Sequence, residues 1–161
     1  MYFYSEYFLM KLLNPFKFNM FTMLRLPSAW LCGVRLREIN PERSRVTVTH
    51  RWINQNPFKS MFWAVQGMAA ELSTGALVVS YIDNSDHKIS MLVVNNKATF
   101  TKKATGKITF ICEDGLKIKN AIATAIETKE GQTCWMKAIG TNREGLTVSE
   151  FQFEWTVKVK G

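Results

Sequence analysis

The block from Met61 to Leu72, MFWAVQGMAAEL, constrains the fold more than any other part of the sequence. It is apolar on nearly every side of a helical projection, and its one charged residue is Glu71. A helix that is hydrophobic all round is buried rather than laid on a surface. We therefore predict a buried helix of about twelve residues, roughly 18 Å long at the standard rise, which other elements must cover on more than one side.

Strand patterns surround this block. Residues 34–39 and 45–53 alternate apolar and polar side chains across a short NPE turn, which is typical of a β-hairpin. The stretch ALVVSYI, residues 76–82, is a continuous apolar run that favours a buried strand directly after Gly75. Further strands are predicted within residues 87–103, 106–112 and 133–160.

Two other features complete the predicted order of elements. The last strand places large apolar side chains on one face, namely Phe151, Phe153, Trp155, Val157 and Val159. Between the strands, residues 114–131 change to helical spacing, with Asp114 as the predicted N-cap and Gly131 as the predicted stop. We interpret this segment as an amphipathic surface helix.

The first thirty residues are the most hydrophobic part of the chain, and we expect them to form one or two short helices packed on the domain. Glu6 and Lys11 interrupt the apolar run and Pro15 stops it, so it is too short and too charged to span a bilayer. We therefore expect no stable membrane insertion. Contact with a membrane surface is the alternative use of this segment.

Composition sets the outer bounds. A chain of 161 residues with 47% hydrophobic and 21% charged residues predicts a single globular domain, residues 1–161. Cys32, Cys112 and Cys134 are odd in number and far apart, which excludes a disulfide framework and predicts reduced thiols in a cytoplasmic protein. The histidines His50 and His87 fit neither a metal site nor a triad, so no metal is expected.

The formal charge of +8 admits several partners. Most lysines alternate with apolar residues along amphipathic segments, which indicates a solvated face. Phosphate-bearing ligands and nucleic acid are the alternatives, but no nucleic-acid recognition motif with stacking aromatics is present, so no nucleic acid is expected.

Two segments and the order of elements carry a resemblance to a known family. The segments are NPFKFNMFTMLRLPSAWLCGVRL and NPFKSMFWAVQGMAAELSTG. Together with the strand order they resemble the hotdog fold of the thioesterase superfamily, and most closely its branch of uncharacterised thioesterase-like proteins. The resemblance implies an α+β fold in which a curved antiparallel sheet wraps around a long central helix, with N-terminal helices and one extra outer helix. It also implies a homodimer, or a dimer of such dimers, with composite clefts at the dimer interface.

The same resemblance implies hydrolysis of acyl-CoA or a similar acyl thioester. Coenzyme A would then enter as part of the substrate, held in part by scattered lysines, with no separate cofactor. Related acyl-CoA thioesterases carry an acidic residue nine positions after a histidine at the helix start. Here the acidic residue is Glu71, and Phe62 stands in the histidine's place.

The residues themselves leave alternatives open. Glu71 lies on the same helical azimuth as small residues such as Gly67, so it is either the general base or nucleophile, or a paired charge at the helix end. Free amides around Phe62 and Trp63 would receive the oxyanion. Asn56 is either a donor to the substrate carbonyl or part of the turn before Pro57.

Gln66 could orient a water or a carbonyl, but a solvent-facing or interface-facing glutamine is the stronger interpretation. The alternative function is a non-catalytic protein that binds acyl-CoA or another fatty ligand, which the bulky Phe62 and Trp63 favour. Nucleic-acid binding through the basic surface is a third possibility.

Overall fold

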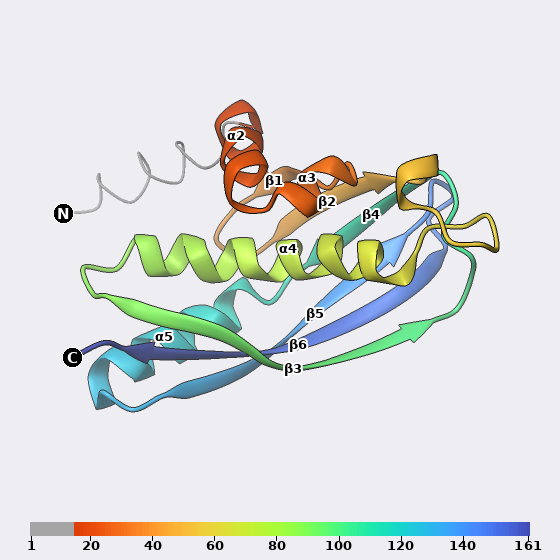
Figure 1. Ribbon diagram of the computed structural model, residues 1–161. Helices are drawn as coiled ribbons and strands as arrows, with labels where there is room; N and C mark the ends of the chain where they lie inside the picture. Colours follow the sequence, from red (N-terminus) through yellow and green to blue (C-terminus); the bar gives the residue numbers. More distant parts are fainter. Residues whose placement is uncertain (1–14) are drawn as a thin grey trace.

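The computed structural model describes residues 15–161, and the helix predicted from residues 4–12 lies outside this range. Six strands form one antiparallel sheet in the order β1-β2-β4-β5-β6-β3 (Figure 1). The strands are β1 (Arg35–Ile39), β2 (Ser44–Thr49), β3 (Ile89–Phe100), β4 (Lys107–Cys112), β5 (Gln132–Thr141) and β6 (Thr147–Val159). The curved sheet lies against one long helix, which confirms the predicted α+β architecture.

The central helix α4 runs from Trp63 to Asp83 and has 21 residues. The prediction of a short helix followed by a strand over residues 76–82 is therefore wrong. β-branched and aromatic side chains after Gly75 favour a strand locally, but each is a tolerable helix residue once packing decides. The helix continues because its second half packs into the core, where Leu77 and Val78 are completely buried.

The sheet places one row of large apolar side chains under α4. On β6 these are Phe151, Phe153, Trp155 and Val157, all buried, while the intervening residues face outward. This confirms the predicted alternation of the last strand. β6 lies between β5 and β3, and its pairing with β3 runs from Ser149 opposite Phe100 to Val159 opposite Ile89. β3 has no partner on its other side within the described residues.

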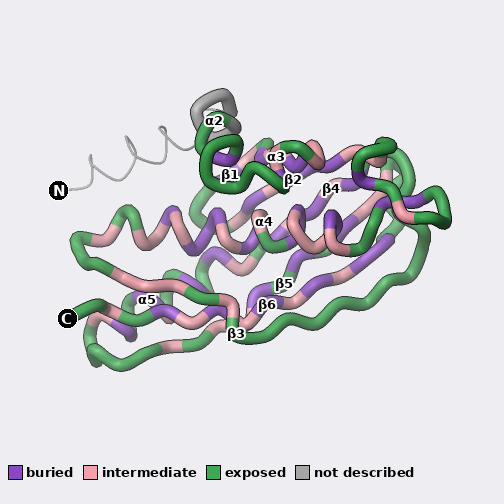
Figure 2. Tube along the Cα trace, viewed as in Figure 1, coloured by how far each residue is buried: buried purple, intermediate pink, exposed green. Residues whose placement is uncertain are grey.

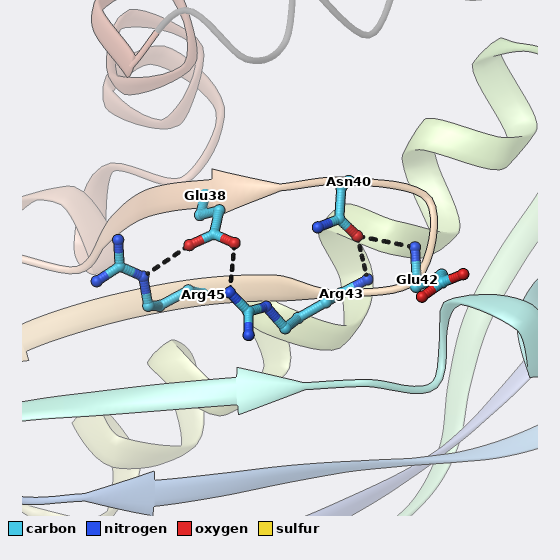
Figure 3. A network of polar contacts seen from close by, with 5 residues as sticks. All are labelled: Glu38, Asn40, Glu42, Arg43 and Arg45. Atoms are coloured by element: carbon cyan, nitrogen blue, oxygen red, sulfur yellow. Dashed lines mark hydrogen bonds and ion pairs between the residues drawn. The ribbon is translucent and has the colours of Figure 1, made fainter.

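The predicted hairpin is formed by β1 and β2. Its turn is closed by Asn40, whose Oδ1 accepts hydrogen bonds from the amides of Glu42 and Arg43 at 3.0 and 2.8 Å (Figure 3). Glu38 on β1 pairs with Arg43 at 2.6 Å and with Arg45 at 3.2 Å. These partners hold the pKa of Glu38 below its ordinary value, chiefly through the hydrogen bond from Arg43.

The remaining helices flank the core. Helix α5 (Gly115–Thr128) packs against β5, β6 and α4 through its buried face, which includes Ile118 and Ile122 and confirms the predicted amphipathic helix. It ends before Gly131, because Lys129 already adopts the left-handed conformation, with φ 63°. Helices α2 (Pro15–Arg25) and α3 (Pro27–Leu31) confirm the helical start predicted after residue 14.

Burial follows this arrangement. The buried residues concentrate on the strands facing α4 and on the helix itself, whereas β3 is exposed along most of its length (Figure 2). None of the helices within residues 15–161 is both long enough and apolar enough to cross a membrane.

Candidate functional site

A cavity of about 570 Å³ lies along one face of α4, between this helix, the α2–α3 segment and residues of β1, β3 and β6. Glu71, Gly75, Val79 and Asp83 recur every four residues along α4 and all line it. At 3.6 residues per turn, this spacing keeps them on one face of the helix. Apolar residues on the same side complete this wall, namely Met68, Leu72 and Ala76.

The opposite wall comes from the start of the chain. Helices α2 and α3 contribute Phe21, Leu26 and Ala29, together with the polar residues Arg25 and Ser28. Strands close the remaining sides through Ile39, Met91 and Trp155. The cavity is thus mainly apolar, with three charged side chains in its lining, and its size is in the range of pockets that bind small organic ligands.

Glu71 and Asp83 are the two carboxylates of this cavity. Within the described residues, neither accepts a side-chain hydrogen bond or forms an ion pair. Both are open to solvent, yet the surrounding protein displaces part of their water. This desolvation raises the pKa of both carboxyl groups above their ordinary values. A carboxylate whose pKa is raised accepts a proton more readily than an ordinary carboxylate, which is the property required of a general base.

The position of Glu71 within α4 excludes one of the two interpretations of this residue. Because α4 continues to Asp83, Glu71 lies in the middle of the helix rather than at its end. The interpretation of Glu71 as a helix-end charge is therefore wrong. Pairing across an interface between subunits stays a prediction.

Asn56 lies in the loop before α4 and is occupied by local contacts. Its Oδ1 accepts hydrogen bonds from the amides of Phe58 and Ser60 at 2.9 and 3.2 Å, and its Nδ2 donates to the Ser60 hydroxyl at 3.0 Å. This is the turn chemistry that the sequence offered as the alternative. Asn56 does not line the cavity that contains Glu71, and its role as a hydrogen-bond donor to the substrate stays a prediction.

The helix start differs from expectation in one respect. Phe62 is the N-cap residue of α4, and its amide already donates to the carbonyl of Asn54 at 2.8 Å. The Phe62 carbonyl accepts from Val65 and Gln66. The amides left for an external acceptor are therefore those of Trp63 and Ala64, and no side chain caps them.

Gly67 and Gln66 both face the sheet rather than a ligand cavity. A Cβ built at Gly67 would lie 3.5 Å from the Phe151 ring, so this glycine lets α4 approach the aromatic row of β6. Gln66 is buried, and its Oε1 accepts a hydrogen bond from the Ser149 hydroxyl at 2.8 Å. The interpretation of Gln66 as a solvent-facing or interface-facing residue is therefore wrong.

Two charged residues of the cavity were not predicted. Asp83 was missed because residues 76–82 were assigned to a strand; the four-residue repeat from Glu71 identifies it once the helix is extended. Arg25 was missed because no sequence signal links α2 to the middle of α4. Their position in one cavity with Glu71 is a tertiary feature.

The cysteine and histidine side chains are not part of the cavity lining. The thiols of Cys32, Cys112 and Cys134 are free, and burial raises the pKa of Cys112 to about 12, which makes it a poor nucleophile. The Nε2 atom of His50 is buried without a hydrogen-bond partner in the described part of the chain. Among residues 15–161, no three His, Cys, Asp or Glu side chains are placed to bind a metal ion.

The fold and the long central helix define the chain as a hotdog-fold protein. A protein of unknown function from Pseudomonas aeruginosa, described as a probable thioesterase, superposes with a TM-score of 0.77 at 20% identity, covering 88% of this chain and 93% of that chain. A protein of unknown function from Chlorobaculum tepidum gives a TM-score of 0.76 at 16% identity, covering 92% and 98%. A thioesterase from Haemophilus influenzae gives 0.65 at 10% identity, covering 91% of each chain.

Residues 16–157 match the family described as "Domain of unknown function (DUF4442)", and the chain belongs to this family. No curated protein shows significant sequence similarity to it. The family and fold confirm the predicted resemblance to uncharacterised thioesterase-like hotdog proteins.

Proposed function

We propose that the protein hydrolyses acyl thioesters such as acyl-CoA, with Glu71 as the general base. The observation that carries this proposal is a carboxylate with a raised pKa, unpaired within residues 15–161, in the wall of an otherwise mainly apolar cavity. The cavity offers apolar surface to an acyl chain, and Glu71 offers a proton acceptor at its edge. Thioesterases among proteins of the same fold support this choice of reaction.

In the proposed reaction, the Glu71 carboxylate takes a proton from a water molecule as that water attacks the thioester carbonyl carbon. The carbonyl electron pair moves onto oxygen, which forms a tetrahedral oxyanion. When the carbonyl reforms, the carbon–sulfur bond breaks, and Glu71 returns its proton to the leaving thiolate. The products are a free carboxylic acid and a free thiol. Direct attack by Glu71, followed by hydrolysis of the resulting anhydride, is the variant in which Glu71 is the nucleophile.

The oxyanion requires hydrogen-bond donors, and the free amides of Trp63 and Ala64 are suitable because the positive end of the α4 dipole lies there. Trp63 precedes Glu71 by eight residues, which is about 12 Å along a helix. One carbonyl cannot contact both groups of the same chain. We therefore place Glu71 of one subunit opposite the helix start of a second subunit, where Asn56 and Phe62 would shape the substrate pocket.

This arrangement requires a homodimer, and β3 is suited to form it. The strand has twelve residues and occupies the edge of the sheet. It exposes Leu92, Val94 and Phe100. A long exposed edge strand pairs readily with another chain, so pairing of β3 with its symmetry mate would join two sheets edge to edge. The expected result in light scattering is a dimer, and Leu92→Glu should weaken it; a monomer that hydrolyses thioesters would contradict the composite site.

Coenzyme A is proposed as the carrier, with its phosphates held by exposed lysines, and the cytoplasm as the location. The test is a thiol-release screen over acyl-CoAs of increasing chain length, with Glu71→Gln as the control. We expect release by the native protein and a loss of about two to four orders of magnitude in the variant. Equal rates for the two proteins would exclude Glu71 as the base.

A second candidate is a non-catalytic protein that binds acyl-CoA or another fatty ligand. Phe62 at the place of the family histidine favours it, because the phenyl ring carries no group that can accept or donate a proton. Calorimetry would distinguish the two functions. Binding of acyl-CoA without release of thiol, unchanged by Glu71→Gln, would support the binding protein and contradict hydrolysis.

A further inference from the structure

One end of the molecule exposes an unusual set of apolar side chains. Trp52 is 83% exposed, Phe58 is 73% exposed and Ile53 is 51% exposed. Trp52 and Ile53 belong to the short 3-10 helix Trp52–Asn54, and Phe58 lies in the loop that leads to α4. Leaving large aromatic side chains in water is unfavourable, so a contiguous exposed group of them marks a contact surface.

The loop carrying Phe58 projects from the body of the protein. Its two arms are held together by the bridge between Gln55 and Met61, and the amide of Asn56 donates to the carbonyl of Ser60 at 2.8 Å. Lys59 follows Phe58 in a left-handed conformation with φ 58°. The hairpin therefore presents an aromatic side chain and a lysine together at its tip, at the end of the molecule opposite the C-terminus (Figure 1).

Two further loops lie beside this hairpin. The amide of Met61 donates to the carbonyl of Ala104 at 2.8 Å, and Thr101 donates from its amide to the carbonyl of Val148 at 2.9 Å. These contacts bring residues 101–106 and 142–146 to the same end. Leu146 adds another exposed apolar side chain.

The charges at this end have one dominant sign. Residues 51–63, 101–107 and 142–146 contain one acidic residue, Glu144. They contain six basic residues, all exposed, which are Arg51, Lys59, Lys102, Lys103, Lys107 and Arg143. This end therefore supplies most of the net charge of +8 carried by the whole chain.

We propose that this end is a docking surface for an anionic lipid membrane. The docking surface consists of Trp52, Ile53, Phe58 and Leu146 with the six basic residues named above. Trp52 and Phe58 would enter the interfacial layer, because Trp, Phe and Leu are the side chains that interfacial segments bury there. The basic side chains would remain at the level of the headgroups and attract anionic lipids.

The chemistry favours a lipid surface over other polyanions. Single-stranded nucleic acid is bound in grooves where aromatic side chains stack on successive bases. Here Phe58 is at the tip of a projecting hairpin, and the aliphatic Ile53 and Leu146 accompany the rings. A second copy of this chain would bring six basic residues against six more, which opposes association through this end.

The test measures flotation of the full chain with vesicles of phosphatidylcholine alone and with vesicles that also contain phosphatidylglycerol. We expect binding to the anionic vesicles that weakens as salt is added. Lys102→Glu/Lys103→Glu should weaken binding about 25-fold or more, at about five-fold for each basic charge lost. Trp52→Ser and Phe58→Ser should each weaken it about ten-fold or more.

Matched controls come from the other end of the molecule. Lys88→Glu/Lys119→Glu removes the same charge, and Leu116→Ser removes an apolar side chain that is about as exposed as Ile53. These controls should bind like the native protein. Equal loss in controls and test variants, equal binding to neutral vesicles, or binding of single-stranded RNA in place of vesicles would overturn the proposal.

Discussion

The two sides of α4 differ in whether their polar side chains have hydrogen-bond partners. On the side that faces the sheet, every polar contact is completed: the Trp155 indole donates to Thr74 Oγ1 at 3.0 Å, and the Ser149 hydroxyl donates to Gln66 at 2.8 Å. On the side that faces the cavity, Glu71 and Asp83 have no such partner within the described residues. The first side therefore stabilises the fold, and the second holds the carboxylates, of which we propose Glu71 as the general base.

The largest difference in stability should come from truncating one aliphatic residue on each side. Leu77 is fully buried against the sheet, and Leu77→Ala should lower the free energy of unfolding by about 2 to 5 kcal/mol. Val79 lines the cavity and is only partly buried, so removing its two methyl groups in Val79→Ala should cost about 1 kcal/mol, less than the roughly 0.8 kcal/mol per carbon of full burial. Urea unfolding of both variants tests this, and equal losses would contradict the distinction between the two sides.

A smaller effect is expected at the buried polar pair. Gln66→Leu leaves the Ser149 hydroxyl without its acceptor and should cost about 1 to 3 kcal/mol of unfolding free energy. Adding Ser149→Ala removes the unpaired donor and should recover part of that loss. If the double variant were no more stable than Gln66→Leu alone, the unpaired Ser149 hydroxyl would not explain the unfolding free energy that Gln66→Leu loses.

The pH dependence of the unfolding free energy should report the titration of the two carboxylates in the cavity. Burial raises the folded-state pKa of Glu71 and Asp83, so these groups hold protons more tightly in the folded protein than in the unfolded chain. Their contribution is therefore fully present below the unfolded-state pKa and is lost as pH rises through the raised folded-state pKa. Relative to the native protein, Glu71→Gln/Asp83→Asn should become progressively more stable across this range. Parallel curves from thermal unfolding at several pH values would contradict it.

The smallest effects should come from the two glycines of α4. An added Cβ would meet ordinary contacts at Gly67, so Gly67→Ala should stabilise the protein by up to about 1 kcal/mol through helix propensity. At Gly75 the Cβ would lie 3.3 Å from the Trp155 ring, and this crowding should offset most of the gain. Differential scanning calorimetry should therefore rank Gly67→Ala above Gly75→Ala; the reverse order would contradict the packing described for β6.

Much of this architecture could be predicted from residue patterns. The alternation of β6 and the three- and four-residue spacing of α5 reflect burial of one face. One-sided burial requires apolar residues at regular intervals, so the sequence pattern shows it. The second half of α4 could not be predicted, because Val78, Val79 and Ile82 suit a strand locally, and only tertiary packing of the whole segment selects a helix.

For the candidate site, the sequence singled out Glu71 as the odd charge in an apolar block, and the structure places it in a cavity wall. The cavity itself depends on α2 and α3, which approach α4 only in the folded chain. Asn56 accepts a hydrogen bond from the Phe58 amide, and the Phe62 amide donates to the Asn54 carbonyl. These contacts form only in the folded loop, and residue spacing does not reveal them.

The most direct test of the central claim compares two carboxylates of the same cavity. Thiol release from acyl-CoA should be measured for the native protein, Glu71→Gln and Asp83→Asn, with circular dichroism to confirm folding. The account predicts a fall of about two to four orders of magnitude for Glu71→Gln, and retained activity for Asp83→Asn. A folded Glu71→Gln protein that releases thiol at the native rate would contradict it.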